Sequence, residues 1–468
     1  MLFTSFVFLQ IFLPLVMLIN LCIRSIKWKN IFLLAASLFF YAWGEPNNVF
    51  LLIVSLVVNY FIARQGLKFD LPDNIRKRFL TAGVLFNLLI LFIFKYTSPL
   101  MFFLDGIFHF NFHISNILLP LGISFFTFQI VSYLLDTYRK NNHPQQNFFD
   151  LSLYIMLFPQ LVAGPIVKYH DIAEQLADRT QSWNDCTYGI RRFIYGLAKK
   201  VLIANQMACL ADEIFQIPGN VLDCKTAWLG ITAYTLQIYF DFSGYSDMAI
   251  GLGRMLGFRF KENFNLPYTA RSIQDFWHRW HISLSTWFKE YLYIPLGGSR
   301  KSEKRTYINV MIVFIATGIW HGAGLNFVIW GAYYGVLLVL ERWKLKRWLD
   351  NPRFYILGHI YTLIAVMIGW VFFRADNLHQ AWHYCGKLFS FSANAKLPLT
   401  DFLTVPFVIL LVISILFTGP IPRLKCFRNE LSRENICWYD FIVQPVLLTA
   451  ALLLLAGNTY NPFIYFRF

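Results

Sequence analysis

The sequence predicts an all-α polytopic membrane protein with roughly ten to twelve transmembrane or re-entrant helices. The first observation is composition. Of the 468 residues, 57% are hydrophobic and only 14% are charged, which differs strongly from the average soluble domain. The second observation is that apolar stretches of near-membrane length recur along the chain. The third is that Lys and Arg residues gather in alternate loops between these stretches.

Each apolar stretch is long enough, or nearly long enough, to cross a bilayer as a helix. The shorter stretches are expected to be tilted, incomplete or re-entrant. In chain order, the stretches are Leu2–Ile23, Ile31–Gly44, Val49–Ala63, Phe79–Phe94, Ile117–Leu135, Thr226–Phe240, Tyr307–Leu340, Phe354–Phe373, Phe402–Thr418 and Phe441–Ala456. The first stretch lacks a basic region before it and is followed by positive charge, so it is expected to be retained as a helix.

The positions of the basic residues predict the orientation of the chain. Basic residues follow the first, third and fifth apolar stretches, whereas residues 45–48 and 97–116 contain no Lys or Arg. By the positive-inside rule, the N-terminus is expected outside and the basic loops in the cytoplasm. Later basic clusters expected on the cytoplasmic side lie at 300–305, 341–347 and 423–428. The net charge of +15 therefore reflects topology, and no nucleic-acid partner is predicted.

One membrane domain is expected over residues 1–468, because neither a soluble domain nor an internal repeat is evident. Its catalytic core is expected at about 226–375, where the polar stretch 241–305 interrupts the hydropathy pattern. The seven cysteines are odd in number and form no C-x-x-C motif, so neither a disulfide framework nor a zinc site is predicted. The Gly-containing basic turn at 295–305 could attract a phosphate-rich ligand, although topology alone also explains its charges.

The segment "TGIWHGAG" at 317–324 places a histidine in a strongly apolar region. Between Tyr307 and Leu340 the sequence has no Asp, Glu, Lys or Arg, so His321 is the side chain there that titrates near neutral pH. The Gly-rich "HGAGLN" predicts two short helices that meet at His321, each rising about 24 Å for about sixteen residues. His321, beside Trp320 and Gly322, should lie deep in the protein at the floor of a cavity. This position favours acid–base catalysis over a purely structural histidine.

A helix is expected from about Ile273 to Leu292, with His278, His281 and Ser285 on one side of it. Aromatic residues, including Trp280, would surround that side. The alternative is an amphipathic helix at the membrane interface, with the histidines as bystanders. Because a metal site needs three or four ligands and H-E-x-x-H is absent, no metal is predicted here.

A pair of carboxylates, Asp241 and Asp247, follows the apolar stretch that ends at Phe240, together with Ser243 and Tyr245. Carboxylates at membrane depth either face a water-filled cavity or pair with a cation. Contact with substrate and a structural ion pair are therefore both open. The cations considered as structural partners are Arg254, Arg271 and Arg279.

Several long sequence blocks, taken together, resemble the membrane-bound O-acyltransferases, and within them the alginate and peptidoglycan O-acetyltransferase branch. The blocks are "YFDFSGYSDMAIGLGRMLGF" (239–258), "NFNLPYTARSIQDFWHRWHISLSTWFKEYLYIPLGG" (263–298), "GIWHGAGLNFVIWG" (318–331), "WVFFRA" (370–375) and "NPFIYFRF" (461–468). His321 matches the family's presumed catalytic histidine in the W-H-G segment, and His281 matches the second family histidine. No role is carried onto His278.

The resemblance implies a ring of helices around a central acyl-transfer tunnel in the bacterial cytoplasmic (inner) membrane. It implies that acetyl-CoA, or another thioester, enters from the cytoplasm as a substrate, with no bound cofactor. It also implies a separate extracytoplasmic serine-hydrolase-like (SGNH-type) acetyltransferase as partner, a polysaccharide biosynthesis or export complex, and contact with membrane lipid. A proton-coupled transporter or flippase without thioester chemistry is the main alternative, and a scaffold without catalytic activity is another.

Overall fold

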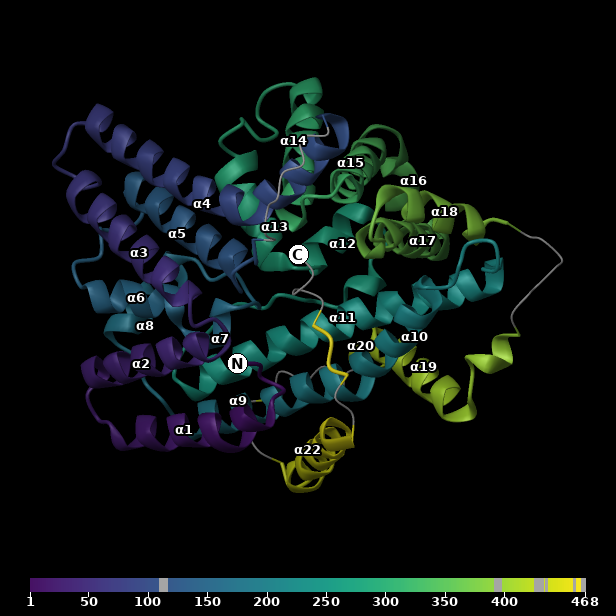
Figure 1. Ribbon diagram of the computed structural model, residues 1–468, viewed down its shortest axis with the longest axis horizontal. Helices are drawn as coiled ribbons and strands as arrows, with labels where there is room; N and C mark the ends of the chain where they lie inside the picture. Colours follow the sequence, from purple (N-terminus) through teal and green to yellow (C-terminus); the bar gives the residue numbers. More distant parts are fainter. Residues whose placement is uncertain (109–116, 391–397, 425–432, 434–436, 458–459, 464–468) are drawn as a thin grey trace. The chain divides into compact units, whose positions relative to one another are not determined.

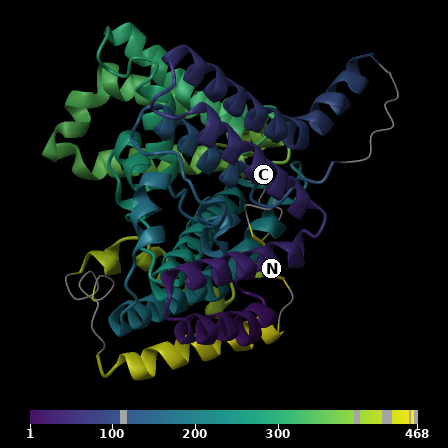
Figure 2. The ribbon, with the colours of Figure 1, turned by 90° about the vertical axis from the view of Figure 1, so that its left-hand side faces the viewer.

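The computed structural model describes residues 1–108, 117–390, 398–424, 433, 437–457 and 460–463. Within these ranges every regular element is a helix, as Figures 1 and 2 show, and no strand occurs. The predicted all-α fold is therefore confirmed. Outside the described residues lie residues 425–428 of the basic cluster 423–428, which include Cys426, and the last five residues of the 461–468 block.

The chain is a multi-pass membrane protein. Among the described residues, five helical segments are long and apolar enough to cross a bilayer. These segments are Asn48–Gly66 (α3 and the turn after it), Asp73–Phe108 (α4), Pro352–Arg374 (which contains α17), Val405–Arg423 (α19 and α20) and Asp440–Gly457 (α22). The other apolar stretches predicted from sequence form shorter or less apolar helices, so the total of ten to twelve stays a prediction.

The described residues divide into two compact units. The first comprises Met1–Phe193 and Ser246–Lys261. Its helices include α1 (Leu13–Cys22), α2 (Ile26–Gly44), α3 (Asn48–Phe61), α4, α5 (Ile123–Tyr138), α6 (Phe148–Met156) and α8 (Tyr169–Ala177). Phe8, Phe12, Phe40 and Phe158 pack their rings together between α2 and the N-terminal residues. The prediction of a single membrane domain stays a prediction.

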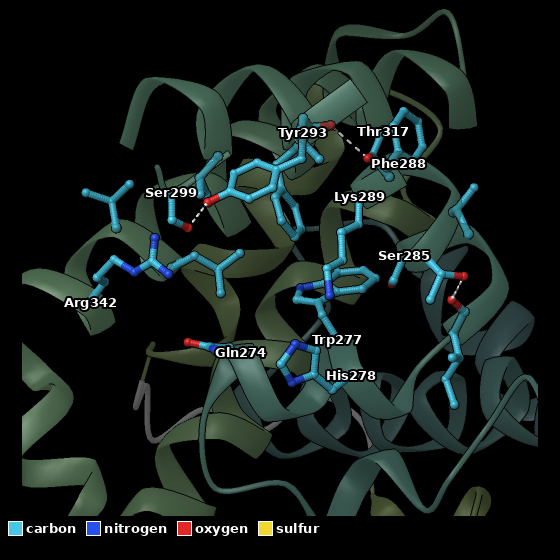
Figure 3. Close-up of a pocket in the computed structure, with 18 of the residues that line it drawn as sticks. Gln274, Trp277, His278, Ser285, Phe288, Lys289, Tyr293, Ser299, Thr317 and Arg342 are labelled. Atoms are coloured by element: carbon cyan, nitrogen blue, oxygen red, sulfur yellow. Dashed lines mark hydrogen bonds between the residues drawn. The ribbon is translucent and has the colours of Figure 1, made fainter. Parts of the chain in front are cut away.

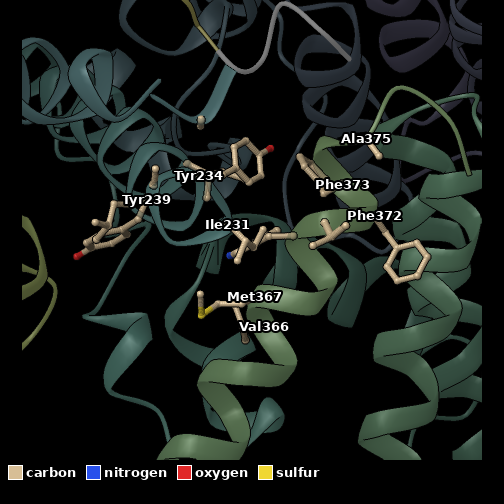
Figure 4. Packing of buried hydrophobic residues seen from close by; sticks show 14 of the residues in the cluster. Ile231, Tyr234, Tyr239, Val366, Met367, Phe372, Phe373 and Ala375 are labelled. Atoms are coloured by element: carbon tan, nitrogen blue, oxygen red, sulfur yellow. The ribbon is translucent and has the colours of Figure 1, made fainter. Parts of the chain in front are cut away.

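The second unit comprises Ile194–Tyr245, Glu262–Arg433 and Cys437–Phe468, and it contains both candidate catalytic histidines. Its main helices are α10 (Asn205–Phe215), α11 (Cys224–Met255, which also contributes to the first unit), α12 (Ile273–Arg279), α13 (Ile282–Phe288), α14 (Glu303–His321), α15 (Leu325–Leu340), α17 (Tyr355–Arg374) and α18 (Leu378–Leu388). Figure 4 shows part of its core, a buried cluster that includes Tyr234 and Tyr239 of α11 and Val366, Met367 and Phe373 of α17.

Helix α11 is longer than the sequence predicted. The apolar stretch was expected to end at Phe240, but the helix continues through the polar residues to Met255. Two features explain the extension. The carboxylates beyond residue 240 pair with cations, and glycines allow neighbouring backbone to approach. A Cβ on Gly244 would lie 2.7 Å from the Gly196 carbonyl oxygen, and one on Gly251 would lie 2.6 Å from that of Gly189.

The stretch 307–340 forms two helices, as predicted. α14 ends at His321 and α15 begins at Leu325, with Gly322 extended between them. The two helices pack closely because their contact is made by glycines. A Cβ on Gly318 would lie 2.3 Å from the Phe327 carbonyl oxygen, and one on Gly331 would lie 2.3 Å from that of Phe314.

Replacing Gly318 by Ala is expected to destabilise the protein by about 1–3 kcal/mol, because the clash is with backbone and the helices must separate. The matched control is Gly386→Ala in α18, where an added Cβ meets no atom within 4 Å. The control should be neutral or stabilising by up to about 1 kcal/mol, since alanine favours helix. Thermal unfolding in detergent measures both variants. Equal behaviour of the two would contradict close packing of α14 on α15.

Candidate active site

His321 is the last residue of α14, and its side chain is buried with 5% exposure. Aromatic rings surround the imidazole edge to face: the ring centroids of Trp320, Trp330 and Phe373 lie 4.9, 5.1 and 5.0 Å from it. Gly322 follows in extended conformation, and a Cβ there would lie 2.3 Å from the Phe327 ring. The structure thus places Trp320 and Gly322 beside His321 in a dry, aromatic environment.

His281 does not lie within a continuous helix from Ile273 to Leu292, so that prediction was wrong. The helix breaks into α12 and α13, and His281 sits at the break with a left-handed backbone (φ +43°). Asn263 explains the break, because its carbonyl oxygen accepts from Ile282 N–H at 3.0 Å and its side-chain Oδ1 accepts from Ser283 N–H at 3.1 Å. These two donors would otherwise bond to carbonyls one turn earlier in a helix.

The break separates residues that were predicted to share one helix side. His281 is 1% exposed, with its ring 4.6 Å from that of Phe242, whereas His278 is exposed and Ser285 is half-buried. Trp280 packs into the core, with its ring 4.9 Å from Trp370. The tryptophans of this region, Trp277, Trp280 and Trp287, are all buried in the protein, which does not fit an interfacial amphipathic helix.

Both histidines border one aromatic cluster. From His281 the ring contacts run through Phe242, Phe264, Trp280 and Trp370. Trp370 in turn packs on Phe373 and Trp330, the two rings that also contact His321. His281, at the break between α12 and α13, and His321, at the end of α14, therefore lie at the edges of the same aromatic cluster.

The hydrogen bonds of Asn263 fix the chemical state of His281. Asn263 Oδ1 accepts from the Ser283 hydroxyl at 2.8 Å and lies 3.1 Å from His281 Nδ1. An oxygen in that position requires Nδ1 to carry the proton, so Nε2 carries the lone pair. Burial lowers the pKa of His281 to about 3, and the ring is therefore neutral at physiological pH. His281 can accept a hydrogen bond through Nε2 but does not act as a cation.

Asn263→Ala is expected to lower both stability and activity. It removes Oδ1, the one oxygen that accepts from Ser283 N–H, the Ser283 hydroxyl and His281 Nδ1–H. Each buried donor left without an acceptor costs about 1–3 kcal/mol. It also frees the tautomer of His281, so activity per folded molecule should fall at least tenfold. Asn265→Ala, two residues away and exposed, is the control. Turnover and unfolding are measured for both variants. If Asn263→Ala behaved like Asn265→Ala, this role of Asn263 would be refuted.

Both carboxylates pair with cations, through a lysine and an arginine that the sequence analysis did not consider. Asp241 binds Lys200 at 2.8 Å, with both side chains at most 4% exposed, and Asp247 binds Arg192 at 2.7 Å in the first unit. A spacing of six residues puts the two carboxylates on different faces of α11. Of the arginines considered as partners, Arg254 binds Asp185, Arg279 binds Asp275, and Arg271 lies over the Tyr355 ring.

Ser243 and Tyr245 are both buried on α11, and the Tyr245 ring lies 4.8 Å from that of Phe463. The sequence-based reasoning missed Lys200, which pairs with Asp241. The signal available was a lysine placed directly before the apolar run that starts at Val201. A lysine at the start of an apolar helix needs a partner if that helix is buried.

A cavity of about 510 Å³ lies between α12, α13, α14 and the end of α15 (Figure 3), and its lining includes neither His281 nor His321. Most of its wall is apolar, and its polar lining includes His278, Lys289 and Arg342. Ser285 also lines it, as does Thr317, which precedes His321 by one helical turn on the same face of α14. Ile282, the residue after His281, is part of the wall. The wall of the cavity thus includes the residue one helical turn before His321 and the residue directly after His281 in the sequence.

Among the described residues, no group of three or more His, Cys, Asp or Glu side chains could hold a metal ion. The chemistry that the arrangement can support is proton transfer in a dry site. A histidine surrounded by aromatic rings, next to a mostly apolar cavity with basic groups in its wall, suits a reaction in which a hydroxyl attacks an activated acyl group.

Residues 89–379, which contain both histidines, match the family model of the membrane-bound O-acyltransferases. The chain is 38% identical to a probable alginate O-acetylase of Pseudomonas putida over the full length of both chains. It is 34% identical to a peptidoglycan O-acetyltransferase of Helicobacter pylori, covering 100% of this chain and 98% of the relative. It is 30% identical to a teichoic acid D-alanyltransferase of Bacillus subtilis, covering 57% of this chain and 71% of the relative.

Proposed function

Because the chain belongs to the membrane-bound O-acyltransferase family, we propose that it passes acetyl groups from cytoplasmic acetyl-CoA across the membrane for O-acetylation of an exported or cell-wall polysaccharide. It is an O-acyltransferase by family, and its relatives include enzymes that acetylate alginate and peptidoglycan. The observation that carries the proposal is His321, buried among aromatic rings and one turn from a cavity that a thioester can occupy.

In this proposal His321 is the general base. It takes the proton from an acceptor hydroxyl while the hydroxyl oxygen bonds to the thioester carbonyl carbon. The carbon–sulfur bond then breaks, and the leaving thiolate receives the proton back from His321, so that an ester and free thiol are formed. His281, neutral and held by Asn263, orients the acceptor by accepting, through its Nε2 lone pair, a hydrogen bond from a second O–H or N–H group beside the reacting hydroxyl.

The donor occupies the cavity of Figure 3. Its apolar wall suits the extended arm of acetyl-CoA, and Lys289 and Arg342 supply charge for the phosphates. Arg342 belongs to the basic cluster 341–347, which the positive-inside rule assigns to the cytoplasmic side. In this proposal the protein lies in a bacterial cytoplasmic membrane with its N-terminus outside. Acetyl-CoA is a substrate in this scheme, and no resident cofactor is proposed.

The acceptor side requires a partner. We infer that a separate extracytoplasmic serine-hydrolase-like (SGNH-type) protein receives the acetyl group and completes its transfer within a polysaccharide biosynthesis or export complex. Asp241, Ser243, Tyr245 and Ser285 remain candidates for lining the path of the acyl group through the lipid-embedded protein. Their burial or half-burial in the second unit supports this placement.

The test is transfer of labelled acetyl from acetyl-CoA by the purified protein, in detergent and in sealed proteoliposomes with or without an imposed proton gradient, each with and without the extracytoplasmic partner. The proposal expects the protein to release CoA, faster when the partner supplies an acceptor hydroxyl, and without need of a proton gradient. Label movement that requires a proton gradient and leaves the thioester intact would instead support a transporter. Acetylation in cells that survives loss of His321 would support a scaffold.

A further inference from the structure

Two of the sequence blocks, "WVFFRA" at 370–375 and "NPFIYFRF" at 461–468, have no role in the mechanism above. In the second unit, Arg374 of the first block and Tyr460, the residue before the second block, meet at one carboxylate. The guanidinium of Arg374 forms an ion pair with Asp212 of α10, and the hydroxyl of Tyr460, directly before the second block, donates to the other oxygen of Asp212. Asp212 therefore joins the end of α17 to the segment Tyr460–Phe463.

Arg374 is held tightly in this arrangement. Its side chain is 6% exposed, and that of Asp212 is 20% exposed. The guanidinium also lies over two aromatic rings, with its carbon 5.2 Å from the Phe215 centroid and 5.9 Å from that of Tyr234. Burying the arginine charge is stable only while the carboxylate beside it balances that charge.

The neighbour of Arg374 connects this arrangement to the active site. Phe373 precedes it in the last turn of α17, and its ring centroid lies 5.0 Å from that of His321. The same ring packs on Trp330 at 5.3 Å, which also contacts His321. Arg374 is the last residue of α17, so its ion pair anchors the same final turn that carries Phe373.

The segment that carries Tyr460 has independent anchors. Asn205 donates to the side chain of Asn461 at 3.1 Å, and Lys200 donates to the carbonyl of Pro462. The Phe463 ring is buried against Tyr245. Because these contacts do not involve Arg374, the segment holds Tyr460, and through it the Asp212 carboxylate, independently of the ion pair.

We infer that Tyr460, Asp212 and Arg374 form a positioning device that holds Phe373 and, through it, His321 in the geometry needed for proton transfer. The inference rests on the proposed role of His321. None of the three residues acts on the substrate directly. The physical reason for the device is that displacement of a catalytic group by about 1 Å can lower a rate by about 10²-fold.

The test compares Tyr460→Phe, Asp212→Asn and the double variant with the native full-length protein, using labelled acetyl-CoA turnover. Tyr460→Phe removes only a hydroxyl, so folding should be retained. We expect kcat to fall about threefold to tenfold in Tyr460→Phe and more in Asp212→Asn, with KM for acetyl-CoA unchanged. The double variant should fall no further than Asp212→Asn, because both changes act through one carboxylate. Arg374→Lys, which keeps the charge, should retain more activity than Arg374→Met.

Asp440→Asn is the matched control, since Asp440 forms a buried ion pair with Arg433 at 2.8 Å. It should leave kcat unchanged. Native kcat in Asp212→Asn, additive losses in the double variant, or a changed KM would each overturn the inference. His321→Ala is measured in parallel. If that variant keeps its activity, the proposed function fails; if it is inactive while Asp212→Asn is fully active, only the positioning device fails.

Discussion

His321→Ala is expected to lower the turnover number of acetyl transfer by about 10²–10⁴-fold, the range over which general acid–base groups contribute. The reason is positional. The imidazole is 5% exposed and lies among Trp320, Trp330 and Phe373 at the end of α14, so bulk water is a poor substitute base. The stretch 307–340 supplies no other titratable group near neutral pH.

The measurement is release of CoA from acetyl-CoA by purified protein, normalised to the folded fraction. His321→Gln should be as inactive as His321→Ala while filling more of the space, which separates loss of the base from loss of packing. His379→Ala, at an exposed position on α18, controls for histidine replacement and should keep native turnover. Turnover by His321→Gln within twofold of native would mean that another group removes the proton.

The position of His321 could be predicted because its signals are local. The charge-free stretch, the glycines after the histidine and the length of each arm all lie within residues 307–340. They predicted two helices that meet at a buried histidine, and α14 and α15 confirm the break.

The setting of His281 could not be predicted in the same way. The helix breaks there because Asn263, eighteen residues earlier, binds the N–H groups of Ile282 and Ser283. Three- and four-residue spacing describes a continuous helix and contains no information about a competing acceptor brought in by the fold. The pair Lys200–Asp241 is similar, since α11 had to extend past residue 240 before its partner could be identified.

Lys200→Met is expected to destabilise the protein by about 3–5 kcal/mol, the cost of leaving one member of a buried ion pair without its partner. The Lys200 and Asp241 side chains are 4% and 1% exposed, so water does not solvate the Asp241 carboxylate that remains. The lysine also donates to the Pro462 carbonyl, and the segment that carries Tyr460 would loosen at the same time.

The double variant Lys200→Met with Asp241→Leu separates the charge effect from other losses. If the uncompensated carboxylate dominates, the double variant should recover most of the lost free energy of unfolding, because apolar replacements of a buried pair are often neutral or stabilising.

Lys225→Met, at an exposed lysine in the first turn of α11, is the control and should change stability by less than about 0.5 kcal/mol. Denaturant unfolding in detergent measures all three variants. A double variant as unstable as Lys200→Met would mean that the contact with Pro462, and not the ion pair, accounts for the stability at this position.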